Sequence, residues 1–335
     1  MVRDRWLFGR RARSFTLQWH LTNACELHCA HCYDRSEREV LEYAAARETL
    51  EDFLRFCRGH GVRGQVCLTG GNPLLYPSFF PIYQAIARAG LPISILGNPA
   101  AREAIDRIVS IRRPVYYQVS LEGLPSHNDR IRGSGHFERT VQFLRTLRRS
   151  HIRAHVMLTL TQANMGQVIP LAQILEGLAD RLTFNRLSPV GEGAQIAAAP
   201  RAEYEEFLRE YLAASRSNPI LGFKDNLFNI LRHRSGRPLL RGCTGFGCGA
   251  AFNFVALLPD GEVHACRKFP SRIGHIRESG FDAIYRSPAA RRFHRGCAAC
   301  LRCPIRNACG GCLAVAYGHG LDIFSQRDPH CFMDS

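Results

Sequence analysis

The stretch FTLQWHLTNACELHCAHC (residues 15–32) places Cys25, Cys29 and Cys32 in one short loop, directly after an apolar, strand-like segment. Four thiolates complete a [4Fe–4S] cluster. Three thiolates leave one iron with an open coordination position, much as a catalytic zinc site keeps one position for its reactant. The loop therefore predicts an iron–sulfur centre whose open iron binds a non-protein ligand.

Three further motifs follow in an order that extends this prediction. A second strand-like segment, QVCLT, leads into the turn GGNP (70–73), and later come SLEG (120–123) and HNDRIRG (127–133). Together with the cysteine spacing, these motifs resemble the radical S-adenosylmethionine (SAM) enzymes over most of residues 15–190. HNDRIRG resembles a loop of the peptide-modifying members of that family.

The resemblance implies a binding site for SAM. In radical SAM enzymes the turn reads Gly-Gly-Glu-Pro and holds the amino group of SAM, whereas here Asn72 replaces the acid. The Asn72 amide oxygen would still accept a hydrogen bond from the ammonium, without the charge assistance of a carboxylate. Ser120 and Glu122 are expected near the ribose, and His31 either near the adenine or only against the cluster. The implied SAM-binding residues are Gly70, Gly71, Asn72, Pro73, Asn98, Ser120, Glu122, Arg132 and His31.

A zinc site or a redox Cys-x-x-Cys pair is the alternative interpretation of the first cysteine group, since Cys29 and Cys32 alone fit that pattern. Neither alternative accounts for Cys25 or for the glycine turn. We therefore favour the iron–sulfur interpretation.

Short apolar runs alternate with segments of helical period over the first two thirds of the chain. Repeated strand–helix units form a parallel sheet with helices outside. Six such units predict an α/β fold, a partial (β/α)6 TIM-like barrel with its chemistry at the C-terminal strand ends. Strands are expected at 15–21, 64–69, 92–97, 115–120, 153–159 and 181–187, and helices at 45–58, 78–89, 101–110, 137–149, 165–178 and 201–215.

The composition changes near Gly236, after which nine of the 14 cysteines lie among glycines and turns. A region so rich in loops needs metal coordination to supply folding energy. The segments LLPDGEVHAC and CLRCPIRNACGGC resemble the twin-cluster SPASM extension of radical SAM enzymes, although a pair of structural zinc sites is an alternative. The resemblance implies two fully ligated [4Fe–4S] clusters, and three in all. The first would be held by Cys243, Cys248, Cys266 and Cys312, and the second by Cys300, Cys303, Cys309 and Cys331.

Three cysteines and two carboxylates are left over. Cys57 and Cys67 lie in apolar helix-like and strand-like contexts, where a free cysteine behaves as a small hydrophobe. Cys297 is either a structural neighbour of the cluster at Cys300 or a thiol that donates hydrogen to a substrate radical. Asp225 and Glu192 are candidate acid–base groups by their position between the halves, although both also fit ordinary polar loop residues.

The composition is that of a globular protein of 335 residues with a formal net charge of +15. Of its 44 basic residues only Lys224 and Lys268 are lysines. The chain shows neither a secretory signal nor an apolar stretch of membrane-spanning length, so we expect a cytoplasmic protein with cysteines serving as metal ligands. Four parts are expected: a basic N-terminal segment (1–14), the radical SAM core (15–195), a bridging region with the last helix (196–240) and the SPASM domain (241–335).

SPASM-bearing radical SAM enzymes mostly modify ribosomally made peptides, so the resemblance implies a peptide maturase that installs a thioether or another crosslink, or makes a related change. Its expected partners are a precursor peptide, acidic if it complements the positive charge, a flavodoxin or ferredoxin-type electron donor and a separate leader-recognition protein. Activation of a sulfatase by formylglycine formation is one alternative. An iron–sulfur electron carrier or metal-stabilised binding protein is another. No interleaving of aromatic and basic residues indicates a nucleic-acid partner.

Overall fold

One curved sheet of nine strands runs through the described part of the chain, which in this computed structural model comprises residues 12–240, 244, 245 and 247–333. The strand order is β6-β5-β4-β3-β2-β1-β7-β8-β9. Neighbours from β6 to β7 pair in parallel, and β8 and β9 add an antiparallel end. The strands are β1 (Ser14–Thr22), β2 (Arg63–Gly70), β3 (Ile93–Leu96), β4 (Tyr117–Ser120), β5 (Ala154–Leu160), β6 (Arg181–Arg186), β7 (Phe254–Leu257), β8 (Glu262–His264) and β9 (Arg272–His275).

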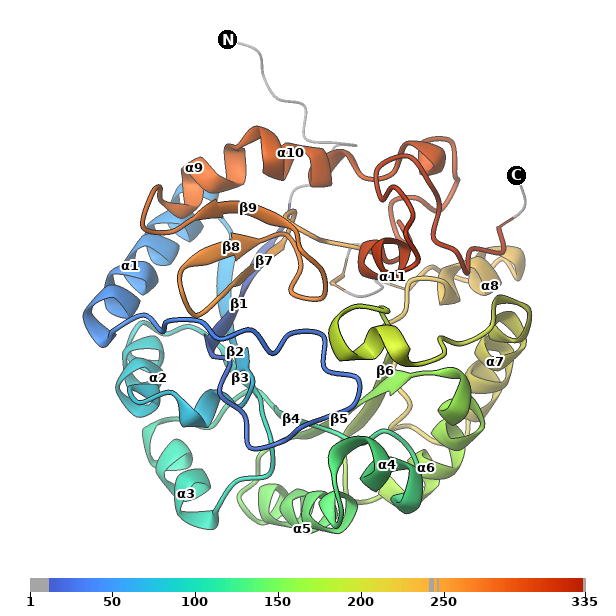
Figure 1. The fold of residues 1–335 in the computed structure, drawn as a ribbon, viewed down its shortest axis with the longest axis horizontal. Coiled ribbons are helices and arrows are strands. Elements are labelled where there is room, and N and C mark those ends of the chain that lie inside the picture. The colour runs from blue at the N-terminus through green and yellow to red at the C-terminus, as the bar shows by residue number, and fades with distance from the viewer. Residues whose placement is uncertain (1–11, 241–243, 246, 334–335) are drawn as a thin grey trace.

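The helices form a ring outside this sheet, as a parallel sheet built from strand–helix units requires, except for the last of them, which lies inside the ring (Figure 1). They are α1 (Tyr43–His60), α2 (Phe79–Arg88), α3 (Arg102–Ile111), α4 (Pro125–Arg132), α5 (His136–Arg149), α6 (Val168–Leu175), α7 (Arg201–Ala214), α8 (Phe228–Arg234), α9 (Phe281–Arg286), α10 (Pro288–Arg295) and α11 (Leu313–Gly318). The six predicted strand–helix units and the partial barrel are thereby confirmed, and the sheet does not close on itself.

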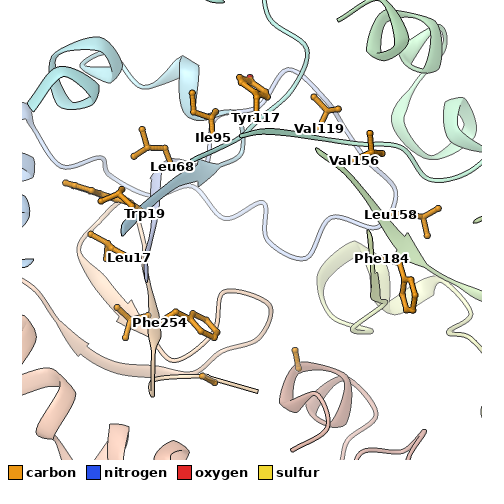
Figure 2. Close-up of a cluster of buried hydrophobic side chains, with 14 of the residues drawn as sticks. Leu17, Trp19, Leu68, Ile95, Tyr117, Val119, Val156, Leu158, Phe184 and Phe254 are labelled. Atoms are coloured by element: carbon orange, nitrogen blue, oxygen red, sulfur yellow. The ribbon is translucent and has the colours of Figure 1, made fainter. Parts of the chain in front are cut away.

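Side chains alternate between the two faces of the sheet. In β1, Leu17 and Trp19 are buried beneath the helices, whereas Gln18 and His20 point into the barrel and line its cavities. Figure 2 shows the outward, apolar set, which continues on the neighbouring strands with Leu68, Ile95, Tyr117, Val119, Val156, Leu158 and Phe184. The helices therefore stabilise the outer face, and the polar inner face is left to line a site.

Two details differ from the expected pattern. HNDRIRG (127–133), expected to be a loop, lies mostly in helix α4. Pro125 suits the first turn of this helix, and Gly133, at φ +100°, ends it. The helix expected at 165–178 is also shorter, because residues 162–167 form a 3-10 helix that Thr161 and Asn164 cap reciprocally.

The C-terminal third also contributes strands, which the sequence pattern did not predict. β7 pairs with β1 in parallel, from Thr16 opposite Phe254 to Trp19 opposite Leu257, and a hairpin then adds β8 and β9. These strands are three or four residues long, too short to show a period, and the partner of β7 is more than 230 residues away. The sheet is therefore continuous across the boundary expected at residue 241.

Within the described ranges, no helix has the length and hydrophobicity that crossing a bilayer requires.

The difference in burial predicts a large difference between two valine-to-alanine substitutions. Val156→Ala removes two carbon atoms from the buried face of β5 and should lower the free energy of unfolding by about 2 kcal/mol. Val115→Ala, at a position 48% exposed, should cost less than about 0.5 kcal/mol. Urea denaturation followed by circular dichroism measures both, and equal losses would contradict the burial of Val156 in the core.

Candidate active site and iron–sulfur ligands

The ends of the parallel strands surround a cavity of about 410 Å³, here called the strand-end cavity. The cysteine loop after β1, the glycine turn after β2 and the ends of β3, β4 and β6 all contribute to its wall. Of the residues expected at the SAM site, those that line it are Cys25, Cys29, Cys32, Gly70, Gly71, Asn98, Ser120, Arg132 and His31. The structure thus brings together groups that are more than 100 residues apart in the sequence.

The glycine turn packs directly against the cysteine loop. The Gly71 N–H donates to the Thr22 carbonyl and the Asn72 N–H to the Ala24 carbonyl, each at 2.8 Å. A Cβ atom on Gly70 would overlap the Thr22 carbonyl oxygen, and Gly70 also adopts φ +141°. Only glycine permits this approach of two backbones, which is the physical reason for the motif.

Hydrogen-bond donors point at two of the three thiols in the cysteine loop. The Asn98 Nδ2 atom lies 3.4 Å from Cys25 Sγ, and the Arg132 Nη1 atom lies 3.5 Å from Cys29 Sγ. An amide and a guanidinium stabilise the charge of a thiolate. The set of three cysteines on one wall, with donors directed at two of the sulfurs, therefore fits thiolate ligation of a cluster.

Glu122 supports this wall from behind and does not line the cavity. Its Oε1 atom lies 3.0 Å from His31 Nε2 and 2.6 Å from Arg132 Nη2. Its Oε2 atom accepts from the Thr159 N–H at 2.7 Å. Burial raises the pKa of Glu122, but the charges of His31 and Arg132 and their hydrogen bonds outweigh it and lower the pKa to about 2. The ionised Glu122 thus orients both residues.

A second cavity of about 400 Å³, the interior cavity, lies inside the barrel. Three of the cysteines expected to hold the first auxiliary cluster, Cys248, Cys266 and Cys312, lie on its wall. The fourth, Cys243, lies outside the described residues. Residues that line both cavities include Arg186, Arg267 and Lys268, so the two cavities share a wall of basic side chains.

Arg186, at the end of β6, joins the barrel to the C-terminal cysteine region. Its guanidinium donates to Asp225 at 2.8 Å and to both carboxylate oxygens of Asp328 at 2.7 Å. Asp328 in turn accepts from the Cys312 N–H at 2.7 Å. Burial works against the charge of Arg186, but the two carboxylates raise its pKa, and Arg186 stays a cation. Asp225 is therefore held in a buried ion pair.

The four cysteines expected at the second auxiliary cluster, Cys300, Cys303, Cys309 and Cys331, line one small cavity. Cys297 does not join them there. It is buried on a separate cavity beside Cys300, and its Sγ donates to the Gln326 carbonyl at 3.0 Å. The structure thus gathers the expected ligands and places Cys297 next to them.

The other candidates lie apart from the strand-end cavity. Glu192 is exposed, and its N–H donates to the Cys32 carbonyl at 2.9 Å, so its backbone contacts the cysteine loop. Asn72 and Pro73, the second half of the glycine turn, are buried and do not line the cavity. Cys57 and Cys67 are buried, and burial raises their pKa values to about 12 and about 11, which keeps both as neutral thiols.

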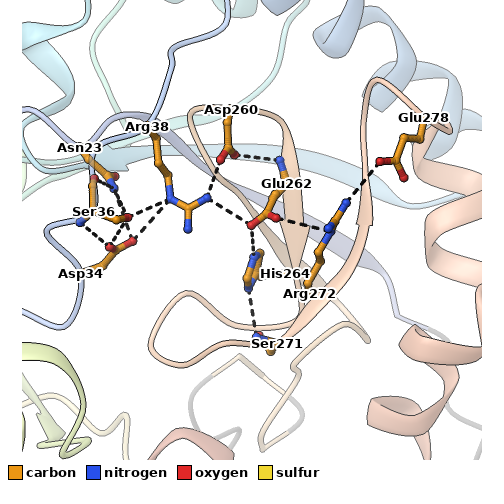
Figure 3. A network of polar contacts seen from close by, with 10 residues as sticks. All are labelled: Asn23, Asp34, Ser36, Arg38, Asp260, Glu262, His264, Ser271, Arg272 and Glu278. Atoms are coloured by element: carbon orange, nitrogen blue, oxygen red, sulfur yellow. Dashed lines mark hydrogen bonds and ion pairs between the residues drawn. The ribbon is translucent and has the colours of Figure 1, made fainter.

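The structure also reveals a polar network that the sequence did not indicate (Figure 3). Arg38, six residues after the last cysteine of the loop, donates to Asp260 at 2.5 Å and to Glu262 at 3.2 Å. Asn23 and Asp34 are bonded to Ser36 within the same loop. The contacts of Arg38 connect the cysteine loop to the β7–β8 hairpin. Their partners are more than 220 residues apart, so no local pattern could have found them.

Comparisons with known proteins agree with this geometry. Residues 19–175 match the family model of the radical SAM superfamily, and residues 248–312 match that of SPASM, the iron–sulfur cluster-binding domain. The mycofactocin maturase MftC of Mycobacterium ulcerans is 28% identical over 340 residues, which cover 94% of this chain and 87% of the relative. The AdoMet-dependent heme synthase of Methanosarcina barkeri is 26% identical over 345 residues, covering 94% and 95%.

Among solved structures, SuiB of Streptococcus suis bound to its precursor peptide SuiA has a TM-score of 0.75 at 17% identity, over 96% of this chain and 76% of SuiB. That likeness shows the fold. The two matched domains support SAM and iron–sulfur clusters as the cofactors.

The Arg38 network predicts a loss of stability that depends on pH. Partial burial raises the pKa of Asp260, but hydrogen bonds from the Glu262 N–H and Arg38 outweigh it and lower the pKa. A carboxyl group with a lower pKa in the folded than in the unfolded protein stabilises the fold at pH values above its unfolded pKa, which is near 4. This stabilisation is lost as the pH falls from there through the folded pKa. Arg38→Gln should therefore lower the free energy of unfolding by about 1–2 kcal/mol at pH 7 and by less below pH ~4.

Urea denaturation at pH 7 and at about pH 3.5 measures this difference. Arg47→Gln is the matched control, since the Arg47–Glu51 pair is about half exposed and should contribute nothing measurable. An Arg38 effect that stayed constant across the two pH values would show that the ion pair is not its source.

Proposed function

This protein is a radical SAM enzyme with a C-terminal SPASM domain, and we propose that it modifies a ribosomally made precursor peptide. The observation that carries the proposal is the strand-end cavity. There, three cysteines of one loop, the glycine turn, Asn98 and Ser120 face the same space. The strand-end cavity and the interior cavity share the basic wall, and together they offer room for a substrate beside SAM.

We propose three [4Fe–4S] clusters, held as the cysteine sets predict. Cys25, Cys29 and Cys32 would hold the one with an open iron, where SAM binds and yields a 5′-deoxyadenosyl radical on one-electron reduction. The chain's own residues would direct hydrogen bonds at two of these thiolates, from Asn98 to Cys25 and from Arg132 to Cys29. The two auxiliary sets would be fully ligated, which favours electron transfer and structural bracing.

Two of the comparisons support a peptide as substrate. MftC is a maturase and aligns along most of its length, and SuiB was solved with its precursor peptide. The heme synthase relative makes an iron porphyrin the second substrate class to test. For the peptide reaction we expect a flavodoxin or ferredoxin-type electron donor and a separate leader-recognition protein in the cytoplasm.

The basic wall supports a substrate that carries a carboxylate. Arg267 is half-buried, donates to Thr69 Oγ1 at 3.0 Å and lies over the Tyr33 ring. No carboxylate of the described residues lies within 4 Å of it, whereas Arg186 beside it is fully paired. Lys268, one of the two lysines, faces both cavities as well. Cations that lack an acidic partner favour a ligand that brings one.

Anaerobic reconstitution tests the assignment of cofactors and activity. Wild-type protein should bind about 12 irons, the sum of three four-iron clusters, and should form 5′-deoxyadenosine with dithionite and SAM. The Cys25/Cys29/Cys32 triple alanine variant should lose about four irons and all cleavage. Zinc in place of iron, or no cleavage by wild type, would overturn the proposal.

Two single variants in the same experiment distinguish Cys300, an expected cluster ligand, from its neighbour Cys297. Cys300→Ser should lower the iron content and change the spectrum of the auxiliary clusters, whereas Cys297→Ser should keep the iron content, since Cys297 does not line the cavity of the four expected ligands and its Sγ donates to the Gln326 carbonyl. A loss of iron in Cys297→Ser would reassign the ligand set.

The basic wall predicts a defect in substrate binding. With an acidic peptide encoded beside the gene, Arg267→Gln should raise KM about 10–100-fold, the effect of losing a charged hydrogen bond of about 1.5–3 kcal/mol. Cleavage of SAM without peptide should change little. The exposed Arg58→Gln is the control. If peptides with Asp and Glu changed to Asn and Gln react equally well, or only a tetrapyrrole reacts, the acidic-peptide proposal is wrong.

A further inference from the structure

Asn72 is the one residue of the glycine turn that departs from the Gly-Gly-Glu-Pro pattern, and its side chain is already engaged. Its Nδ2 atom donates to both carboxylate oxygens of Glu26, at 3.0 and 3.1 Å. Its Oδ1 atom accepts from the Leu74 N–H at 3.3 Å. Asn72 is only 5% exposed. The amide oxygen is therefore directed at the backbone of its own turn and not towards a ligand.

Glu26 brings a negative charge to the same place. Glu26 is exposed and is not itself part of the lining of the strand-end cavity, but its chain neighbours Cys25 and Leu27 are, so its carboxylate lies beside the space proposed for SAM. Among the described residues its side chain receives hydrogen bonds from Asn72 alone, and no Arg, Lys or His nitrogen lies within 4 Å of it. Each carboxylate oxygen accepts one of these bonds and keeps a lone pair for another donor.

The backbone holds the two residues side by side. The Asn72 N–H donates to the Ala24 carbonyl, two residues before Glu26, and the Gly71 N–H donates to the Thr22 carbonyl. Gly71 has no room for a Cβ atom against Ala24 and Asn23. A carboxylate attached at position 26 therefore lies next to the turn, where a longer acidic side chain at position 72 would also end.

We propose that Glu26 accepts the ammonium group of SAM in this protein, and that Asn72 orients its carboxylate. The acid and the amide have exchanged positions between the glycine turn and the cysteine loop. This inference rests on the proposed function, since it concerns the SAM site of that reaction. The charge-assisted bond to the ammonium, which Asn72 alone would not supply, is then restored.

Binding of SAM to the reconstituted, unreduced enzyme tests the proposal by equilibrium dialysis, with iron measured in every sample. Glu26→Gln keeps the size of the side chain and removes its charge, and should weaken SAM binding about 10–100-fold. The double variant Glu26→Asn/Asn72→Glu restores the Gly-Gly-Glu-Pro turn and should bind SAM within about threefold of wild type. Glu37→Gln, an exposed glutamate of the same loop, should bind like wild type.

A SAM analogue without the amino group shows which part of SAM Glu26 meets. Wild type and Glu26→Gln should bind this analogue equally, because the proposed partner of Glu26 is missing. Equal SAM binding by wild type and Glu26→Gln would overturn the inference. The inference would also be overturned if the double variant bound SAM no better than Glu26→Gln does. This second comparison decides the question even if Glu26→Gln binds less iron than wild type. Failure of wild type to bind SAM at all would instead overturn the proposed function.

Discussion

The close approach of two backbones at the ends of β1 and β2 is the constraint on which the site depends. β1 and β2 pair in parallel from Ser14 to Thr22, and the pairing continues past both strands, where Gly71 and Asn72 donate to the carbonyls of Thr22 and Ala24. This contact requires glycine at 70 and 71, because a side chain would collide with the cysteine loop. It fixes the loop that carries the three thiols against the turn that the family resemblance places at SAM.

The two faces of the sheet have different roles. Apolar residues on the outer face pack beneath the helices and supply the stability, which leaves the inner face free for polar groups. An inner face with Gln18, Gln118 and Asn185 cannot close into a dry core, so it lines two adjoining cavities. Such a barrel is hollow where a fully closed one would be packed, and substrate and cofactor can lie within it.

The C-terminal region is attached to the barrel by a few charged contacts as well as by the sheet. Arg186 is bonded to Asp225 and Asp328, and Asp328 to the Cys312 backbone, which connects a strand end to an expected cluster ligand. At the opposite side Arg38 is bonded to Asp260 and Glu262. A buried ion pair of this kind stabilises little against an apolar alternative but is costly to break, so it favours one relative placement of the two halves.

Local patterns in the sequence determined the six strand–helix units and the partial barrel, because alternation and helical period are properties of neighbouring residues. They also placed Cys25, Gly70, Asn98 and Ser120 at the strand ends, where they line one cavity. They did not reveal β7, the basic wall at Arg267 or the pairing of Glu26 with Asn72. Each of these depends on contacts between segments far apart in the chain or on the direction of a single side chain, and only the tertiary structure decides those.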